Sequence, residues 1–198
     1  LFAAAPAEAA SLYTRLGGYP RLLTMTKAYQ AEALAKNQPL LLLHGGDAWQ
    51  GSGYFKLNEG MANAELLSQF GLDAMALGNH EFDLDNQKLA RFIQGVNFPV
   101  LAANLDSRDD PDLSRASNLK PFVIYAFDGN QKSPVTDLDH LPADKQLVAV
   151  IGLVLEDMAN ISPNVGKLRF AKEVASAQAT VDLLQARGIQ RVVALTHI

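Results

Sequence analysis

The chain has 198 residues, of which 48% are hydrophobic and 19% are charged, and it contains no cysteine. This composition is typical of one folded domain rather than a disordered or fibrous chain, and it excludes disulfides and thiolate metal sites. The net charge of -4 without a basic stripe argues against a nucleic-acid polymer as partner. No apolar run approaches the roughly eighteen residues that a membrane span needs.

Short apolar runs alternate with amphipathic stretches, which predicts an α/β fold with largely parallel sheets flanked by helices. The opening LFAAAPAEAASLY lacks a basic segment and is interpreted as a variable surface loop, not a signal peptide. Strands are predicted at 40–43, 74–77, 100–102, 122–126, 147–155 and 192–195. Helices are predicted at 20–36, 61–70, 84–94 and 172–187, with Gly188 as the last helix's cap. The polar segments 107–119 and 128–145 are predicted to be surface excursions.

Hydrophobic periodicity also predicts which helix faces are buried. The first helix would bury a stripe made of Leu22, Thr26, Tyr29 and Ala33. The last would bury Val174, Ala177, Val181 and Leu184. Three aromatic residues, Phe70, Phe92 and Phe98, fall at core spacings, whereas His140 and the run 108–110 are expected in solvated loops.

Polar residues follow three of the predicted strands, at the points where these strands end. His44-Gly45-Gly46-Asp47 follows the first, Gly78-Asn79-His80 the second and Thr196-His197 the last. In open α/β sheets the ligand site lies outside the carboxyl ends of the strands, where such loops converge. We therefore expect Asp47, Asn79, His80 and His197 to meet at one edge.

Carboxylate, amide and imidazole groups are ligands that divalent metals accept in the absence of thiolate, so these residues indicate a metal site. His80 and Asp83 lie three residues apart, a spacing that lets the carboxylate orient the imidazole for proton transfer or charge stabilisation. Simpler alternatives exist for each position. Asn79 is a candidate helix cap, Asp47 a turn aspartate and His197 a strand-end histidine. His44 is assigned to packing or to support of the site.

The same residues carry a family resemblance. Gly46-Asp47, the GNHEFD of 78–83 and Thr196-His197 resemble successive motifs of the calcineurin-like metallophosphoesterases. GGYPRLLT, HGGDAWQGSGYF, FPVLAANL and VAVIGLVLED resemble, in the same order, the secreted 5′-nucleotidase branch, which includes UDP-sugar hydrolases and NAD pyrophosphatases. Trp49 and Gln50 belong to this family context rather than to the chemistry.

The resemblance implies an αββα sandwich and metal-dependent hydrolysis of phosphate esters or anhydrides of nucleotides. Asp47 would bridge two divalent ions, of Zn, Mn, Co, Fe or Mg, while Asn79 and His197 would each bind one. His80, supported by Asp83, would act on the phosphoryl group. The substrate would be a nucleoside monophosphate, a UDP-sugar or a dinucleotide, and the protein would be periplasmic, on the cell surface or extracellular.

The sequence also departs from the family pattern. No Asp-x-His block precedes Gly17, and the final Gly-His-x-His block and the C-terminal substrate domain would lie beyond Ile198. Residues 1–198 are therefore interpreted as part of the N-terminal catalytic domain, and this part alone is expected to be inactive. Two alternatives stay open. One is a thiosulfohydrolase relative, although that group departs from the Asn-His-Glu pattern; the other is a non-catalytic relic, against which His80 and Asp83 argue.

Overall fold

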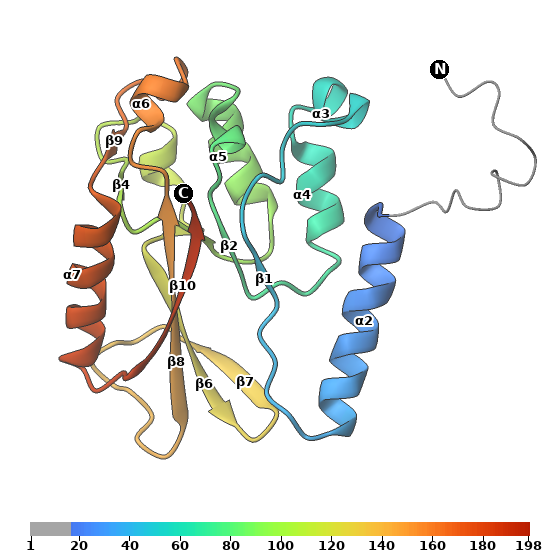
Figure 1. The fold of residues 1–198 in the computed structure, drawn as a ribbon, viewed down its shortest axis with the longest axis vertical. Coiled ribbons are helices and arrows are strands. Elements are labelled where there is room, and N and C mark those ends of the chain that lie inside the picture. The colour runs from blue at the N-terminus through green and yellow to red at the C-terminus, as the bar shows by residue number, and fades with distance from the viewer. Residues whose placement is uncertain (1–16) are drawn as a thin grey trace, which may run out of the picture.

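The structure is a computed structural model that describes residues 17–198, so the loop predicted at the N-terminus lies outside the described residues. Two sheets face each other (Figure 1). The first sheet is wholly parallel, in the order β1 (Leu43–His44), β2 (Ala74–Ala76), β3 (Val100–Leu101), β5 (Leu119–Lys120). The second runs β10 (Arg191–His197), β8 (Gln146–Val154), β6 (Phe122–Asp128), β7 (Gln131–Val135). Only β10 and β8 are parallel in it. A small antiparallel pair joins β4 (Leu105–Asp106) to β9 (Arg169–Phe170).

Helices cover the outer faces of both sheets (Figure 1). The helices of the described residues are α2 (Tyr19–Ala35), α3 (Gly53–Asn58), α4 (Met61–Leu67), α5 (Asn86–Gly95), α6 (Met158–Ile161) and α7 (Glu173–Gln185), with 3-10 turns η1 (His80–Phe82) and η2 (Leu113–Arg115). Of these, α3, α4 and α5 pack on the first sheet and α7 on the second. No helix within residues 17–198 is long and apolar enough to cross a bilayer.

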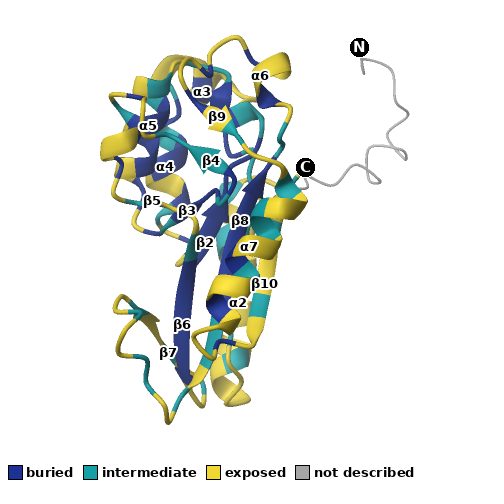
Figure 2. Ribbon diagram, turned by 90° about the vertical axis from the view of Figure 1, so that its left-hand side faces the viewer, coloured by how far each residue is buried: buried dark blue, intermediate teal, exposed yellow. Residues whose placement is uncertain are grey.

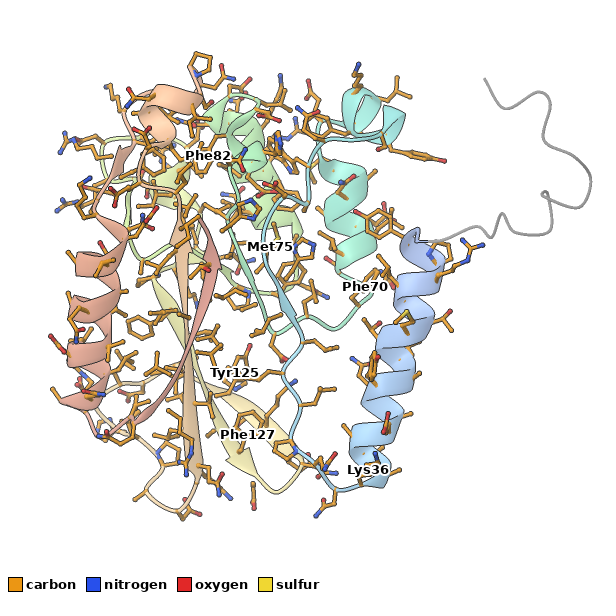
Figure 3. The ribbon with its side chains drawn as sticks, in the orientation of Figure 1. Lys36, Phe70, Met75, Phe82, Tyr125 and Phe127 are labelled. Carbon is orange, nitrogen blue, oxygen red and sulfur yellow. The ribbon has the colours of Figure 1, made fainter. Side chains whose placement is uncertain are left out.

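Three apolar layers hold these elements together, because side chains alternate between the two faces of a strand. Met75 of β2 packs outward beneath α3, α4 and α5, whereas its neighbour Ala74 faces the other sheet. Tyr125 and Phe127 of β6 fill the space between the sheets (Figure 3), and Ile124 beside them packs outward towards α7. The central strands are therefore buried on both faces (Figure 2), as their continuous apolar runs predict. The α/β sandwich is confirmed.

Two predicted helix faces are partly wrong. In α2, Thr26 and Ala33 are half-buried, but Leu22 and Tyr29 are 46% and 54% exposed. Contacts with Phe70 turn this helix so that Leu23 and Gln30 face inward instead, and the Gln30 amide donates to the Phe70 carbonyl at 3.3 Å. In α7, the predicted buried stripe begins about one turn before the stripe that the structure buries.

In α7, Val174 is exposed, while Ala177, Val181 and Leu184 pack against the second sheet and Thr180 is also buried. Gly188, with φ +83°, ends the helix as predicted. Within the excursion at 128–145, the structure adds strand β7, because residues 131–135 pair with β6. His140 is exposed as expected.

The three phenylalanines predicted for the core, Phe70, Phe92 and Phe98, are buried. The run 108–110 is only partly solvated. Asp110 is 5% exposed and accepts hydrogen bonds from the backbone N–H groups of Asp112 and Leu113 and from the Asn86 side chain. The prediction for Asp110 was wrong because a carboxylate that receives local N–H donors can be buried without an opposite charge.

Candidate active site

Two glycine turns meet at the carboxyl ends of β1 and β2. Gly46 has φ +96°, and a Cβ added to it would lie 2.6 Å from the backbone nitrogen of Gly78. A Cβ added to Gly78 would in turn lie 2.2 Å from Oδ1 of Asp47. The chain needs glycine at both positions, because only the absence of side chains lets the two loops approach this closely.

Asp47 is held between these loops in a left-handed conformation, with φ 57°. Its Oδ1 accepts a hydrogen bond from the backbone N–H of His80 at 3.1 Å. Its Oδ2 lies 3.2 Å from Nε2 of His197, and each of these two side chains is 30% exposed. The structure therefore brings together three residues from the ends of β1, β2 and β10, at the edge where the C-terminus lies (Figure 1).

His197 faces Asp47 with a defined ring nitrogen. Its Nδ1 lies 2.8 Å from the carbonyl oxygen of Gly45, which can only accept a hydrogen bond, so Nδ1 carries the hydrogen. In the neutral imidazole the lone pair on Nε2 then points at the Asp47 carboxylate. Two electron-pair donors 3.2 Å apart need a cation between them or near them, either a proton or a metal ion. A carbonyl that fixes the tautomer of a histidine is also the usual support of a metal-binding imidazole.

His80 and Asp83 form a pair on the other side of Asp47. Nδ1 of His80 lies 2.8 Å from Oδ2 of Asp83, and the two side chains are 45% and 25% exposed. This hydrogen bond raises the pKa of the His80 imidazole, and the negative charges of Asp83, Asp47 and Glu81 add to the effect against the opposing effect of burial. Nε2 is left as the nitrogen available to a substrate.

Asn79 lies one residue before His80 and is half-buried. It makes no side-chain capping hydrogen bond to the turn that follows, so the helix-cap alternative does not describe it. Its carboxamide oxygen is thus not committed to a cap. In residues 17–198 no group of three or more His, Cys, Asp or Glu side chains is placed to hold an ion. Of the predicted metal ligands, the structure brings Asp47 and His197 into contact, and Asn79 lies in the loop after β2, next to His80.

Sequence reasoning missed two residues that support the site. Glu81 is fully buried, and its carboxylate accepts hydrogen bonds from backbone N–H groups of both loops. Burial raises the pKa of this carboxyl group, and the hydrogen bonds from Gly78, Asp47 and Ala48 oppose that rise. Gln50 donates a hydrogen bond to Oδ2 of Asp83. A glutamate or a glutamine in a polar loop does not by itself predict such a role. The role arises only because two loops that are distant in the sequence lie close together in the fold.

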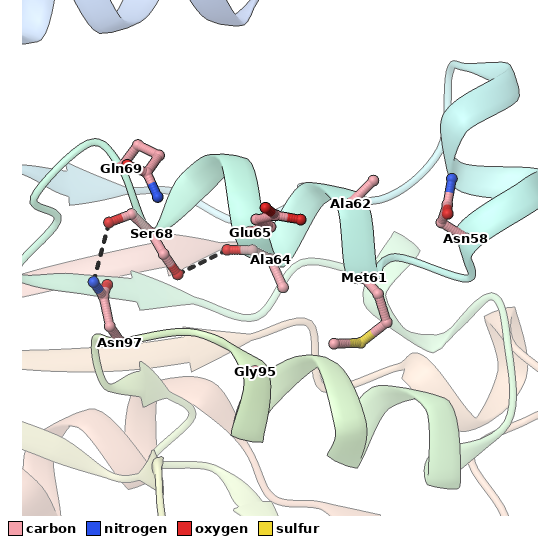
Figure 4. Close-up of a pocket in the computed structure, with 9 residues that line it drawn as sticks. All are labelled: Asn58, Met61, Ala62, Ala64, Glu65, Ser68, Gln69, Gly95 and Asn97. Carbon is pink, nitrogen blue, oxygen red and sulfur yellow. Dashed lines mark hydrogen bonds between the residues drawn. The ribbon is translucent and has the colours of Figure 1, made fainter.

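Neighbouring residues are less central. His44 lies beside the site, where burial and the charge of His197 lower the pKa of its imidazole while Asp47 opposes this. Nδ1 of His44 accepts a hydrogen bond from the Gly46 backbone, which assigns it to support of the loop. A surface hollow of about 450 Å³ between α4 and α5 (Figure 4) is lined by none of the candidate site residues.

No protein-family model matches the chain. The NAD 5′-nucleotidase of Haemophilus influenzae is 32% identical over 158 residues, which cover 79% of this chain and 23% of that protein. A solved structure of a 5′-nucleotidase precursor from Thermus thermophilus superposes with a TM-score of 0.76 and 31% identity, covering 92% of this chain and 32% of that one.

The sulfate thiohydrolase SoxB of Thermus thermophilus superposes with a TM-score of 0.75 over 96% of this chain and 32% of that one, but at 23% identity it shows the fold alone. The chain spans about a quarter of the length of the curated relatives it matches. The named 5′-nucleotidases are hydrolytic enzymes, and they share both sequence and fold with this chain. The chain belongs to the 5′-nucleotidase family of the calcineurin-like metallophosphoesterases.

Proposed function

We propose that the chain carries part of the active site of a metal-dependent nucleotide phosphoesterase, which hydrolyses phosphate esters or anhydrides of nucleotides. The observation that carries this proposal is the approach of Oδ2 of Asp47 to Nε2 of His197, with the lone pair of that nitrogen aimed at the carboxylate. Asp47, His197 and Asn79 would hold divalent ions there. Such ions polarise phosphoryl oxygens and supply hydroxide near neutral pH.

His80 would act on the phosphoryl group. Because Asp83 engages Nδ1, the protonated imidazole presents its Nε2–H outward, where it would donate a hydrogen bond to a phosphoryl oxygen. The raised pKa of His80 increases the protonated fraction near neutral pH. Gln50 donates to the same carboxylate oxygen of Asp83 and limits its rotation. His80 would thus stabilise charge that develops as the phosphoryl group is transferred.

The substrate would be a small nucleotide, because the relatives are named as 5′-nucleotidases and an NAD 5′-nucleotidase. We also propose that residues 1–198 are part of the N-terminal catalytic domain of a longer, exported enzyme. The share of each relative that the chain spans supports the first point, and the description of the Thermus thermophilus protein as a precursor supports the second. A thiosulfohydrolase is the rival, supported by the shared fold with SoxB.

The test is release of phosphate from AMP, UDP-glucose and NAD by the enzyme with its flanking sequence, before and after chelation and after re-addition of Mn²⁺, Zn²⁺ or Co²⁺. Hydrolysis that is lost with chelator and restored by metal supports the proposal. Hydrolysis that survives complete removal of metal contradicts it. Sulfate release from a thiosulfonate substrate without any nucleotide hydrolysis would establish the rival. The 198-residue chain, assayed alone, is expected to be inactive and to bind at most one ion weakly.

A further inference from the structure

We propose that Glu81 is a positioning residue, whose carboxylate clasps the two site loops together and so fixes where Asp47 presents its oxygens. The effect of Glu81 on catalysis rests on the function proposed above. The clasp itself is defined by hydrogen bonds in the described residues. It assigns a role to a buried group that the chemistry at His80 and Asp83 does not use.

The clasp consists of four backbone donors on one carboxylate. Oε2 of Glu81 accepts from the N–H groups of Gly78 at 2.6 Å and Asp47 at 2.8 Å. Oε1 accepts from Ala48 at 2.6 Å and Trp49 at 3.2 Å. Three of these donors are consecutive residues of the loop after β1, and the fourth belongs to the loop after β2. One side chain therefore ties the two loops to each other.

Consecutive N–H groups converge on one point only when the backbone turns into a concave nest, which is a site for an anion. The left-handed conformation of Asp47, with φ 57°, makes that turn. Glu81 fills the nest, and it is 0% exposed, so water cannot replace it. The four backbone N–H groups donate hydrogen bonds to the Glu81 carboxylate, and these bonds offset the free-energy cost of burying its negative charge.

Glu81 and its neighbour His80 hold Asp47 at two points. The Asp47 backbone donates to Glu81, and its Oδ1 accepts from the backbone of His80 at 3.1 Å. These contacts leave Oδ2 facing His197. Because Glu81 is fully buried, it has no path to a substrate, and its influence on catalysis passes through Asp47. The next residue, Phe82, anchors this turn in the core below α5 and α6 (Figure 3).

The variant Glu81→Gln keeps the size of the side chain but turns an acceptor oxygen into an NH₂ group that faces backbone donors. We expect hydrogen exchange at the Asp47 and Ala48 amides to quicken by roughly 10-fold or more, because these bonds weaken locally. Mn²⁺ affinity should fall by roughly 10- to 100-fold, as for other residues that orient metal ligands. In the enzyme, kcat should fall by about 100-fold, the usual effect of a misplacement near 1 Å. KM should change by less than about threefold.

Asp110→Asn is the matched control, since Asp110 is also a buried carboxylate that accepts two backbone N–H groups, but its hydrogen-bond partners, Asn86, Asp112 and Leu113, are not site residues. It should lower the unfolding temperature and leave site amides, Mn²⁺ affinity and kcat unchanged. The proposal is overturned if Glu81→Gln leaves the site amides and Mn²⁺ affinity at wild-type values, or if Asp110→Asn reproduces the loss of Mn²⁺ affinity.

A measurement on the wild-type chain covers the case in which Glu81→Gln does not fold. The Ala48 and Gly78 amides, each 2.6 Å from Glu81, should exchange at the rate of core amides. Exchange at the rate of exposed loops would refute the clasp.

Where Glu81→Gln does fold, the clasp and the proposed function can fail separately. A wild-type protein that hydrolyses no nucleotide, yet shows slow exchange at these amides that Glu81→Gln abolishes, would remove the proposed function and support the clasp.

Discussion

The substitution Gly78→Ala tests how the close approach of the two glycine loops fixes Asp47. The added Cβ would lie 2.2 Å from Oδ1 and 2.6 Å from the backbone nitrogen of Asp47. The carboxylate oxygen must retreat by about 1 Å to reach an ordinary contact, and the backbone nitrogen cannot rotate away. Oδ1 then loses its 3.1 Å hydrogen bond from His80, and Oδ2 leaves its place beside His197.

A displacement of about 1 Å at a reacting group costs on the order of 100-fold in rate, and overpacking costs about 1–3 kcal/mol of stability. We therefore expect Gly78→Ala to reduce nucleotide hydrolysis by about 100-fold and to weaken Mn²⁺ binding. The assays are steady-state phosphate release, metal titration and thermal unfolding, with activity measured well below the unfolding temperature.

Gly45→Ala is the control in the same loop, because no heavy atom lies within 4 Å of the Cβ it would add. It should keep activity within about threefold of wild type, since its backbone carbonyl still accepts from His197. The reasoning is refuted if Gly78→Ala is as active as wild type, or if Gly45→Ala loses as much activity as Gly78→Ala.

Three further predictions concern other contacts. His80→Ala should lower kcat by roughly two to four orders of magnitude while metal content stays normal, and loss of metal would instead make His80 a ligand. The raised pKa of His80 means that its pair with Asp83 stabilises the fold fully below the ordinary pKa of 6.5 and less as pH rises through the folded pKa, so Asp83→Asn should lower the His80 pKa in an NMR titration. Lys132→Met should cost about 3 kcal/mol in urea unfolding, because it leaves the buried Asp73 carboxylate without its 2.6 Å partner; a loss below about 1 kcal/mol would contradict this.

Most strands and four of the helices were predictable, because continuous apolar runs and 3.6-residue periods survive in a single sequence. Short elements such as α3 and β7 were not, since their few residues carry no periodic signal and form through contacts with distant parts of the chain. The exposed faces at Leu22 and Val174 show the same limit. Periodicity reveals that a helix has an apolar stripe, but not whether a neighbouring layer in this chain covers it.

The meeting of Asp47, His80 and His197 followed from the rule that parallel strands end at one edge of a sheet. The structure adds that His197 comes from the opposite sheet, so the meeting depends on how the two sheets are packed. The roles of Glu81 and Gln50 could not be predicted from the sequence, because they also depend on how distant segments pack together. Their partners lie more than thirty residues away, and only the contact between two turns makes an ordinary glutamate or glutamine structurally important.

The hydrogen bond from His197 to the Gly45 carbonyl joins residues 152 positions apart and crosses from one sheet to the other. Contacts between such distant residues cost loop-closure entropy before they form, and folds that depend on them fold slowly. The donor pair at Asp47 is thus completed only after the two sheets have docked. An ion that binds this pair selects the docked molecule and adds to its unfolding free energy, by about 2.7 kcal/mol at a free concentration 100 times the Kd. Under the proposed function, metal supply would then set the stability of the folded protein as well as its rate of hydrolysis.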